Sequence, residues 1–393
     1  MVVRTMHEES STIFGTTEQL MIFGEIFFGT LLVAALYFGY RHIKHGLALP
    51  STPLFDWTTL GLAMWCFTGM LIDAWAHKHG EVDDSFFTPW HAVWYSGFTA
   101  YAGYISWALW RLHDGPIPRN LASLKSFLSG MPKGYAPGVV GMLAFALSGF
   151  GDMLWHTFLG IEGGTDILLS PTHLGLAAGL ILSLMVPATA AWHREGSGEG
   201  FISQIPIIFG LAGAWSVITL FTSYTHYLTL NINSMCAGTS CPPGTEGLEL
   251  ALSAILLQSI IATGFVLWFM KRWKPEFGTF TLLFAINGIA IAAFAPGVIG
   301  KSWQHTLTPL LSGILIDTGY YLWGQKYRLF AFTVPALSII AWYILLGTLA
   351  GKGISLMGWS IHATIGIVFL AGSAGLLVSC LTEPVSNNIQ EIE

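Results

Sequence analysis

Long uncharged apolar stretches recur along the whole chain, and they constrain its fold more than any other feature. A helix needs about 20 such residues to cross a bilayer. About eleven stretches qualify, at 18–40, 56–77, 88–110, 137–158, 171–192, 204–228, 248–270, 277–299, 305–325, 329–350 and 355–380. Because these stretches are continuous rather than alternating, they exclude a transmembrane β-barrel. We therefore predict an all-α, polytopic helical membrane bundle with about eleven transmembrane helices.

The composition also favours a membrane protein. Of the 393 residues, 53% are hydrophobic and only 10% are charged, whereas soluble domains carry about a quarter charged residues. This deficit excludes a water-soluble enzyme, a disordered protein and a nucleic-acid-binding protein with a basic face, and it makes the lipid bilayer a partner. We predict one membrane module at 1–200, which contains a repeated motif, and a second helical membrane module of unknown role at 201–393.

The basic residues predict an orientation, because inner loops of membrane proteins carry an excess of Lys and Arg. With the N-terminus outside, the inner segments hold Arg41, Lys44, Arg111, Arg119, Lys125, Lys133, Arg194, Lys271, Arg272, Lys274, Lys326 and Arg328. The outer segments then hold only Arg4, Lys78, Lys301 and Lys352. An odd number of spans puts the C-terminus inside. We expect a multi-pass protein of the plasma membrane.

A pattern of acidic and histidine residues occurs twice, on two consecutive pairs of spans. Residues 73–91 read DAWAHKHGEVDDSFFTPWH, and residues 152–173 read DMLWHTFLGIEGGTDILLSPTH. Each copy has an Asp, a His four positions later, a loop that contains Asp, and then Thr or Ser, Pro, any residue and His. The principal residues are Asp73, His77 and His91 in the first copy and Asp152, His156 and His173 in the second.

The spacing of this pattern has a structural consequence. An Asp and a His four residues apart lie on one face of a helix, one turn from each other. The last His follows a Ser/Thr-Pro helix start and falls in the first turn of the next helix. Each copy therefore predicts a helical hairpin with a carboxylate and two imidazoles at its outer mouth. These donors suit copper, with zinc or iron possible. A hydrogen-bond network that only joins the helices is the alternative.

The loop of each copy adds further acids. These residues are Asp83, Asp84 and Asp166. A carboxylate beside a metal-binding imidazole fixes the tautomer of that imidazole. We predict that the loop acids support the histidines in this way.

Over roughly residues 60–180, the motif resembles one of the membrane-embedded polypeptides of the particulate methane and ammonia monooxygenase family. Members of that family are copper-dependent membrane oxidases of small apolar molecules. They carry an Asp-x3-His…His copper site and a similarly spaced set in which Asn replaces the Asp. The resemblance implies copper at the two sets of this chain. It also implies other membrane subunits or a secreted cupredoxin-like partner, together with a separate electron donor.

Other polar residues also lie in or near the predicted spans. Glu25 and Asp317 are carboxylates inside spans, so each needs a partner or a proton. A proton path and a hydrogen bond between helices explain them equally well. His226, His305 and His362 lie at outer span ends. Each of these histidines alone is best interpreted as a packing or interface residue.

The predicted function is that of an integral membrane metalloprotein with copper near the outer face. As the resemblance implies, it would be a copper-dependent monooxygenase, or a subunit of one, that oxidises a small apolar substrate with dioxygen. One alternative is a non-catalytic protein for copper or other metal transport or delivery. Another is a haem-binding electron-transfer protein with paired histidines. A scaffold subunit without metal is the last.

Overall fold

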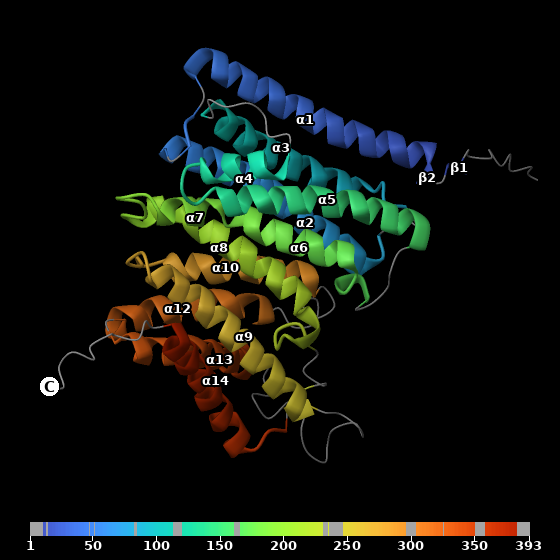
Figure 1. The fold of residues 1–393 in the computed structure, drawn as a ribbon. Helices are drawn as coiled ribbons and strands as arrows, with labels where there is room; N and C mark the ends of the chain where they lie inside the picture. Colours follow the sequence, from blue (N-terminus) through green and yellow to red (C-terminus); the bar gives the residue numbers. More distant parts are fainter. Residues whose placement is uncertain are drawn as a thin grey trace, which may run out of the picture. The chain divides into compact units, whose positions relative to one another are not determined.

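The computed structural model describes residues 11–12, 15–46, 48–50, 52–81, 85–112, 120–160, 166–230, 235, 247–295, 304–324, 326–349 and 358–382. Two short antiparallel strands, β1 (Ser11–Thr12) and β2 (Gly15–Thr16), precede the first helix. The rest of the described regular structure is helical (Figure 1). The elements are α1 (Thr17–His45), α2 (Pro53–His79), α3 (Pro89–Arg111), α4 (Leu121–Ser129), α5 (Ala136–Leu159), η1 (Asp166–Leu168), α6 (Pro171–Leu184), α7 (Val186–Trp192), α8 (Phe201–Phe221), η2 (Ser223–Thr225), α9 (Gly247–Met270), α10 (Thr279–Phe294), α12 (Gln304–Trp323), α13 (Tyr327–Leu349) and α14 (Ile361–Thr382).

The prediction of a helical, multi-pass membrane protein is confirmed. Helices α1, α2, α5, α8, α9, α13 and α14 are each long and apolar enough to cross a membrane. The pair α6 and α7, bent by 42°, would make an eighth span. A helix or this bent pair lies on each of the eleven predicted ranges, but α10 has only 16 residues. The count of eleven crossings and the orientation of the termini therefore stay predictions.

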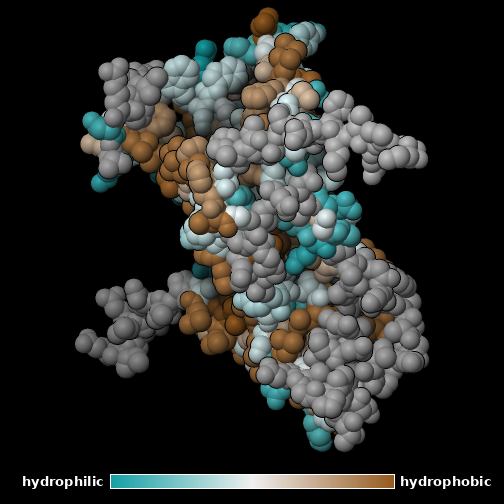
Figure 2. Space-filling view, turned by 90° about the vertical axis from the view of Figure 1, so that its right-hand side faces the viewer, coloured by the Kyte–Doolittle hydropathy of each residue, from teal (hydrophilic) through white to brown (hydrophobic). Residues whose placement is uncertain are grey.

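The surface of the helices is apolar, as a lipid environment requires. Helix α1 buries none of its side chains, and its Phe28 and Val33 are each 68% exposed. Large apolar side chains are also exposed on α5, α13 and α14. Figure 2 shows such side chains in brown on the face turned to the viewer. An apolar surface of this extent is costly in water and is covered by acyl chains in a bilayer.

The chain divides into two compact units. The first comprises 1–198 together with 202–221, and the second comprises 199–201 together with 222–393. The predicted boundary at residue 200 differs from this division by one helix, because α8 packs with the first unit. A Cβ on Gly210 of α8 would lie 2.8 Å from the carbonyl oxygen of Leu184 in α6. The absence of a side chain at this position allows the close approach of the two helices.

In the first unit, α2 and α3 form one helical hairpin, and α5 and α6 form another. Glycine permits the contact inside the first hairpin. A Cβ on Gly69 would lie 2.5 Å from the Cα of Trp94, and one on Gly97 would lie 2.8 Å from the backbone nitrogen of Cys66. Helix α3 also packs on α5, where Phe98 stacks on Phe145 with ring centroids 3.9 Å apart. These contacts bring the two hairpins side by side (Figure 1).

In the second unit, α13 packs between α12 and α14, and α10 packs on α12. Trp342 of α13 is fully buried and contacts Tyr227 and Trp359. The indole of Trp359 donates a hydrogen bond to the carbonyl of Met235, 2.7 Å away. This core contains no set of His, Asp, Glu or Cys residues with metal-binding spacing among the described residues.

Candidate metal centre

The first copy of the motif brings its three predicted metal-binding residues together. Asp73 and His77 lie on the last turns of α2, and His91 lies on the first turn of α3. The Nε2 atom of His91 is 3.3 Å from Asp73 Oδ1, and that of His77 is 3.8 Å from Asp73 Oδ2. The Asp73 and His91 side chains are buried. One carboxylate and two imidazoles thus converge at the mouth of this hairpin.

The second copy repeats the arrangement on α5 and α6. The Nε2 atom of His156 is 3.5 Å from Asp152 Oδ2, and that of His173 is 3.3 Å from Asp152 Oδ1. Asp152 is only 1% exposed. In each set, the three donor atoms lie within 4.8 Å of one another. Each set could therefore hold a metal ion.

The local sequence explains why both copies fold in the same way. Thr88 and Ser170 are the N-caps of α3 and α6, and each is followed by Pro at the first helical position. Their hydroxyl oxygens accept hydrogen bonds from the backbone N–H groups of His91 and His173, at 3.1 and 3.3 Å. The predicted helix starts are confirmed. The N-cap bond fixes each histidine three residues into its helix.

Backbone carbonyls orient the same two imidazoles. His91 Nδ1 lies 2.6 Å from the carbonyl oxygen of Phe86, and His173 Nδ1 lies 2.7 Å from that of Ile167. Because a carbonyl can only accept, the proton of each neutral ring is on Nδ1. This leaves the lone pair of Nε2 directed at the aspartate. Metal-binding imidazoles in proteins are commonly held by such a bond.

The separations inside each set fit a shared cation better than a direct hydrogen bond. The four aspartate–imidazole distances run from 3.3 to 3.8 Å, whereas charge-assisted N–H···O bonds are about 2.7–2.9 Å long. Ligand atoms about 2.0–2.2 Å from a tetrahedral ion lie about 3.3–3.6 Å from one another. In addition, Asp73 Oδ1 is buried and accepts no hydrogen bond from the described residues. A cation between the donors would satisfy this oxygen.

The two sets are neighbours, separated by an aromatic side chain. The Phe86 ring lies with its centroid 4.8 Å from that of His91 and 6.4 Å from that of His156. Tyr95 also contacts Phe86 and His91. The hydroxyl oxygen of Tyr95 is buried and has no hydrogen-bond partner among the described residues. The region between the sets is therefore apolar apart from this one hydroxyl.

The two sets differ in one contact to the aspartate. The Thr172 hydroxyl donates a hydrogen bond to Asp152 Oδ1 at 2.8 Å. Trp90 occupies the corresponding position of the first copy, and its indole instead donates to the carbonyl of Glu81, at 2.8 Å. Asp152 is thus held by a donor that Asp73 lacks.

The structure places the remaining predicted residues elsewhere or leaves them open. Asp83 and Asp84 lie outside the described residues, as do the side chains of Asp166 and His305. Glu25 is exposed on α1 and lines a groove between α1 and α2. His226 is buried, and its Nδ1 accepts a hydrogen bond from the backbone of Leu228, whereas His362 is exposed on α14.

Asp317 caps a helix, which accounts for its burial. Its carboxylate accepts hydrogen bonds from the backbone N–H groups of Gly278, Phe280 and Thr281, at 2.9–3.0 Å. The Thr281 hydroxyl adds a fourth, at 2.6 Å. These donors are the free groups at the start of α10, whose own N-cap, Gly278, has no side chain. Of the two predicted roles, this geometry matches the hydrogen bond between helices, and a proton path stays a prediction.

Sequence reasoning missed the groups around the two sets. The carbonyls of Phe86 and Ile167 carry no side-chain signal, so no motif could have indicated them. Thr172 and Tyr95 lie inside or just beyond the motif, but their partners come from another helix. Comparisons of the chain with protein-family models, curated proteins and solved structures find no match.

Proposed function

We propose that this chain is an integral membrane metalloprotein that holds one first-row transition-metal ion in each Asp-His-His set. The observation that supports this most strongly is the pairing of carboxylate oxygens with imidazole Nε2 atoms that carry lone pairs. Two acceptors that face each other in a buried site repel unless a cation lies between them. The duplication of this arrangement, with the same N-cap and carbonyl contacts, supports a selected ion site over a chance ion pair.

Three protein donors for each ion favour an exchangeable or reactive site. Structural ions in proteins are usually enclosed by four protein ligands, whereas catalytic sites keep a position open. Asp73, His77 and His91 would hold one ion, and Asp152, His156 and His173 would hold the other. Phe86 and the helix packing around it exclude water from the space between them.

The resemblance to the methane and ammonia monooxygenases supports copper as the metal and the outer face of the membrane as its location. We propose that the chain contributes to oxidation of a small apolar molecule. Copper supplies one-electron redox chemistry with dioxygen when it is bound. Insertion of one oxygen atom into a C–H bond, with the other released as water, consumes two electrons and two protons. A separate donor provides the electrons, and other subunits or a cupredoxin-like partner complete the assembly.

Metal analysis of the purified protein tests this proposal. Protein prepared without chelators or a His tag should contain up to two ions per chain. The double variant His77→Ala/His91→Ala should lose one of them, and His156→Ala/His173→Ala should lose the other. His79→Ala is the matched control, because His79 is exposed on the same helix end, stacks on Trp75 and belongs to neither set.

Two further measurements separate copper oxidation from its alternatives. Electron paramagnetic resonance identifies copper(II), and a visible absorption spectrum identifies haem. Oxygen consumption with an added electron donor distinguishes oxidation from metal delivery, which predicts ion transfer without oxygen uptake. Full metal retention in the variant that lacks all four histidines would refute the metalloprotein itself.

A further inference from the structure

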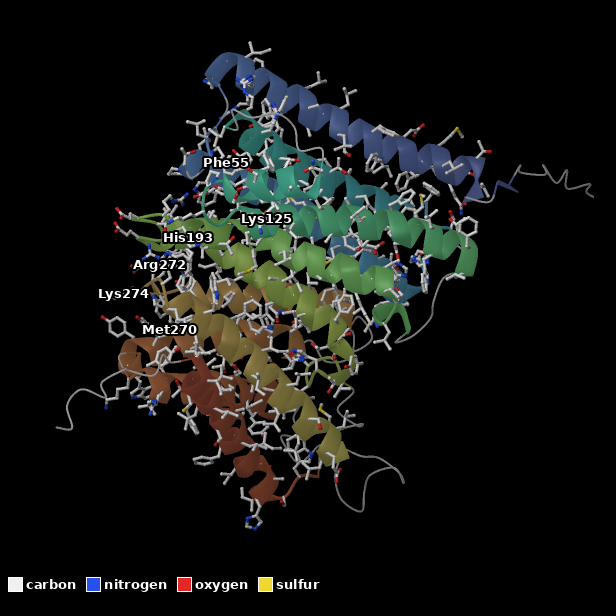
Figure 3. All side chains as sticks on the ribbon, in the orientation of Figure 1. Phe55, Lys125, His193, Met270, Arg272 and Lys274 are labelled. Carbon is white, nitrogen blue, oxygen red and sulfur yellow. The ribbon has the colours of Figure 1, made fainter. Side chains whose placement is uncertain are left out.

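A cavity of about 370 Å³ lies at the end of the first unit opposite the metal sets. It is bounded by the last turns of α1, the first turns of α2 and the last turns of α3. Trp57 in its wall and Asp73 of the first set are 16 residues apart on α2, which is about 24 Å along a helix. Figure 3 labels Phe55, two residues before Trp57, at this end of the bundle. The cavity and the metal sets thus mark opposite membrane interfaces.

The polar lining of this cavity is basic. Arg41 and His42 contribute the ionisable groups, and no Asp or Glu lines it. His42 Nδ1 is buried and has no hydrogen-bond partner among the described residues. The ring of His42 lies edge-on to Trp107, with centroids 5.2 Å apart. Within the described chain no carboxylate forms an ion pair with Arg41. The cavity therefore offers unpaired donors to an anion.

The basic cavity continues into an apolar groove of about 590 Å³ between α1 and α2. The two spaces share Tyr37, Phe38 and Leu62 in their walls. Helix α1 packs on α3, with the Phe38 ring 5.0 Å from that of Tyr104, and this leaves the space beside α2 open. From Gly29 to Arg41 the groove follows 12 residues of α1, about 18 Å. One leaflet of a bilayer core is about 15 Å thick.

We propose that this groove binds an anionic phospholipid. Its phosphate lies at Arg41 and His42, and one acyl chain lies along the apolar section that includes Gly29 and Val33. A basic pocket beside Trp and Tyr at a helix end is an environment that binds lipid headgroups. A free phosphate would use the basic pocket alone, whereas the continuous apolar section fits a molecule with a long hydrocarbon chain. This proposal does not depend on the metal sites.

Native mass spectrometry of the full-length protein tests it. The delipidated protein is mixed with phosphatidylglycerol or with phosphatidylcholine of the same acyl chains, and retained lipid is counted. We expect one retained phosphatidylglycerol. Arg41→Gln should weaken its binding about fivefold, because one basic residue near a headgroup contributes about that factor. Lys44→Gln is the matched control, since Lys44 lies one turn further on, contacts Tyr40 and does not line the cavity.

A second variant tests the apolar section. A Cβ on Gly29 would meet no atom within 4 Å, so Gly29→Leu fills the groove without distorting the backbone. It should reduce retention of both lipids while metal content stays unchanged. Equal retention of the two lipids by the wild type, or equal loss in Arg41→Gln and Lys44→Gln, would overturn the proposal. Displacement of the lipid by inorganic phosphate alone would show an anion site without a lipid and would overturn it as well.

Discussion

The hydrogen bond from Thr172 to Asp152 provides a test that separates the two metal sets. Replacement of Thr172 by Val keeps the shape of the side chain and removes the donor 2.8 Å from Asp152 Oδ1. That oxygen also faces His173 Nε2, at 3.3 Å, and Asp152 is almost fully buried. No water can readily replace the lost donor. Loss of such a contact to a metal ligand typically lowers metal affinity 10–100-fold, about 1.4–2.7 kcal/mol.

The effect should be confined to the second set, because Trp90 takes the place of Thr172 in the first. The assay is a titration of metal-free protein with copper, and separately with zinc, against a competing chelator. One of two binding steps should weaken in Thr172→Val and the other should not move. Thr157→Val is the control, because that hydroxyl bonds only to the carbonyl of Met153 in its own helix. Two unchanged steps, or an equal shift in both, would contradict the assignment of Asp152 as a metal ligand.

Three further outcomes follow from individual contacts. Asp317→Ala removes four hydrogen bonds at the start of α10, including both from Thr281, and should lower unfolding stability by about 2–4 kcal/mol in a detergent melt; an unchanged melt would exclude the capping role. Gly97→Leu forces α3 away from the backbone at Cys66, so metal analysis should show loss of the first ion and retention of the second. Tyr95→Phe removes a hydroxyl without a described partner, so its stability should stay within about 0.5 kcal/mol of the wild type, and a larger loss in the same melt would reveal a bond to that hydroxyl.

Much of the candidate site follows from local spacing. Asp73 and His77 share a helix face because they are four residues apart, and Thr88 and Pro89 start the next helix so that His91 reaches its first turn. Both relations depend only on helix geometry and on the chemistry of an N-cap. The second copy repeats them at a different loop length, which shows that the loop is not what positions the donors.

The role of Asp317 illustrates what local spacing cannot predict. The sequence indicates only that a carboxylate inside an apolar stretch needs a partner. Its donors lie 36 to 39 residues earlier in the chain, on the first turn of α10. Likewise, the space between α1 and α2 exists because α1 packs on α3, a preference that two equally apolar helices do not encode in their own periodicity.

That the chain is a bundle of membrane helices, and that six particular side chains could meet at two helix ends, follows from the amino-acid sequence alone. The uncharged length of each stretch and the separation of Asp and His by one helical turn are properties of short segments. Three other features came only from the packing of the helices: carbonyls orient the imidazoles, Phe86 separates the two sets, and α8 joins the first unit. They depend on which helices approach closely, and that choice is made by glycines and aromatic rings distant in sequence, whose contacts no local pattern records.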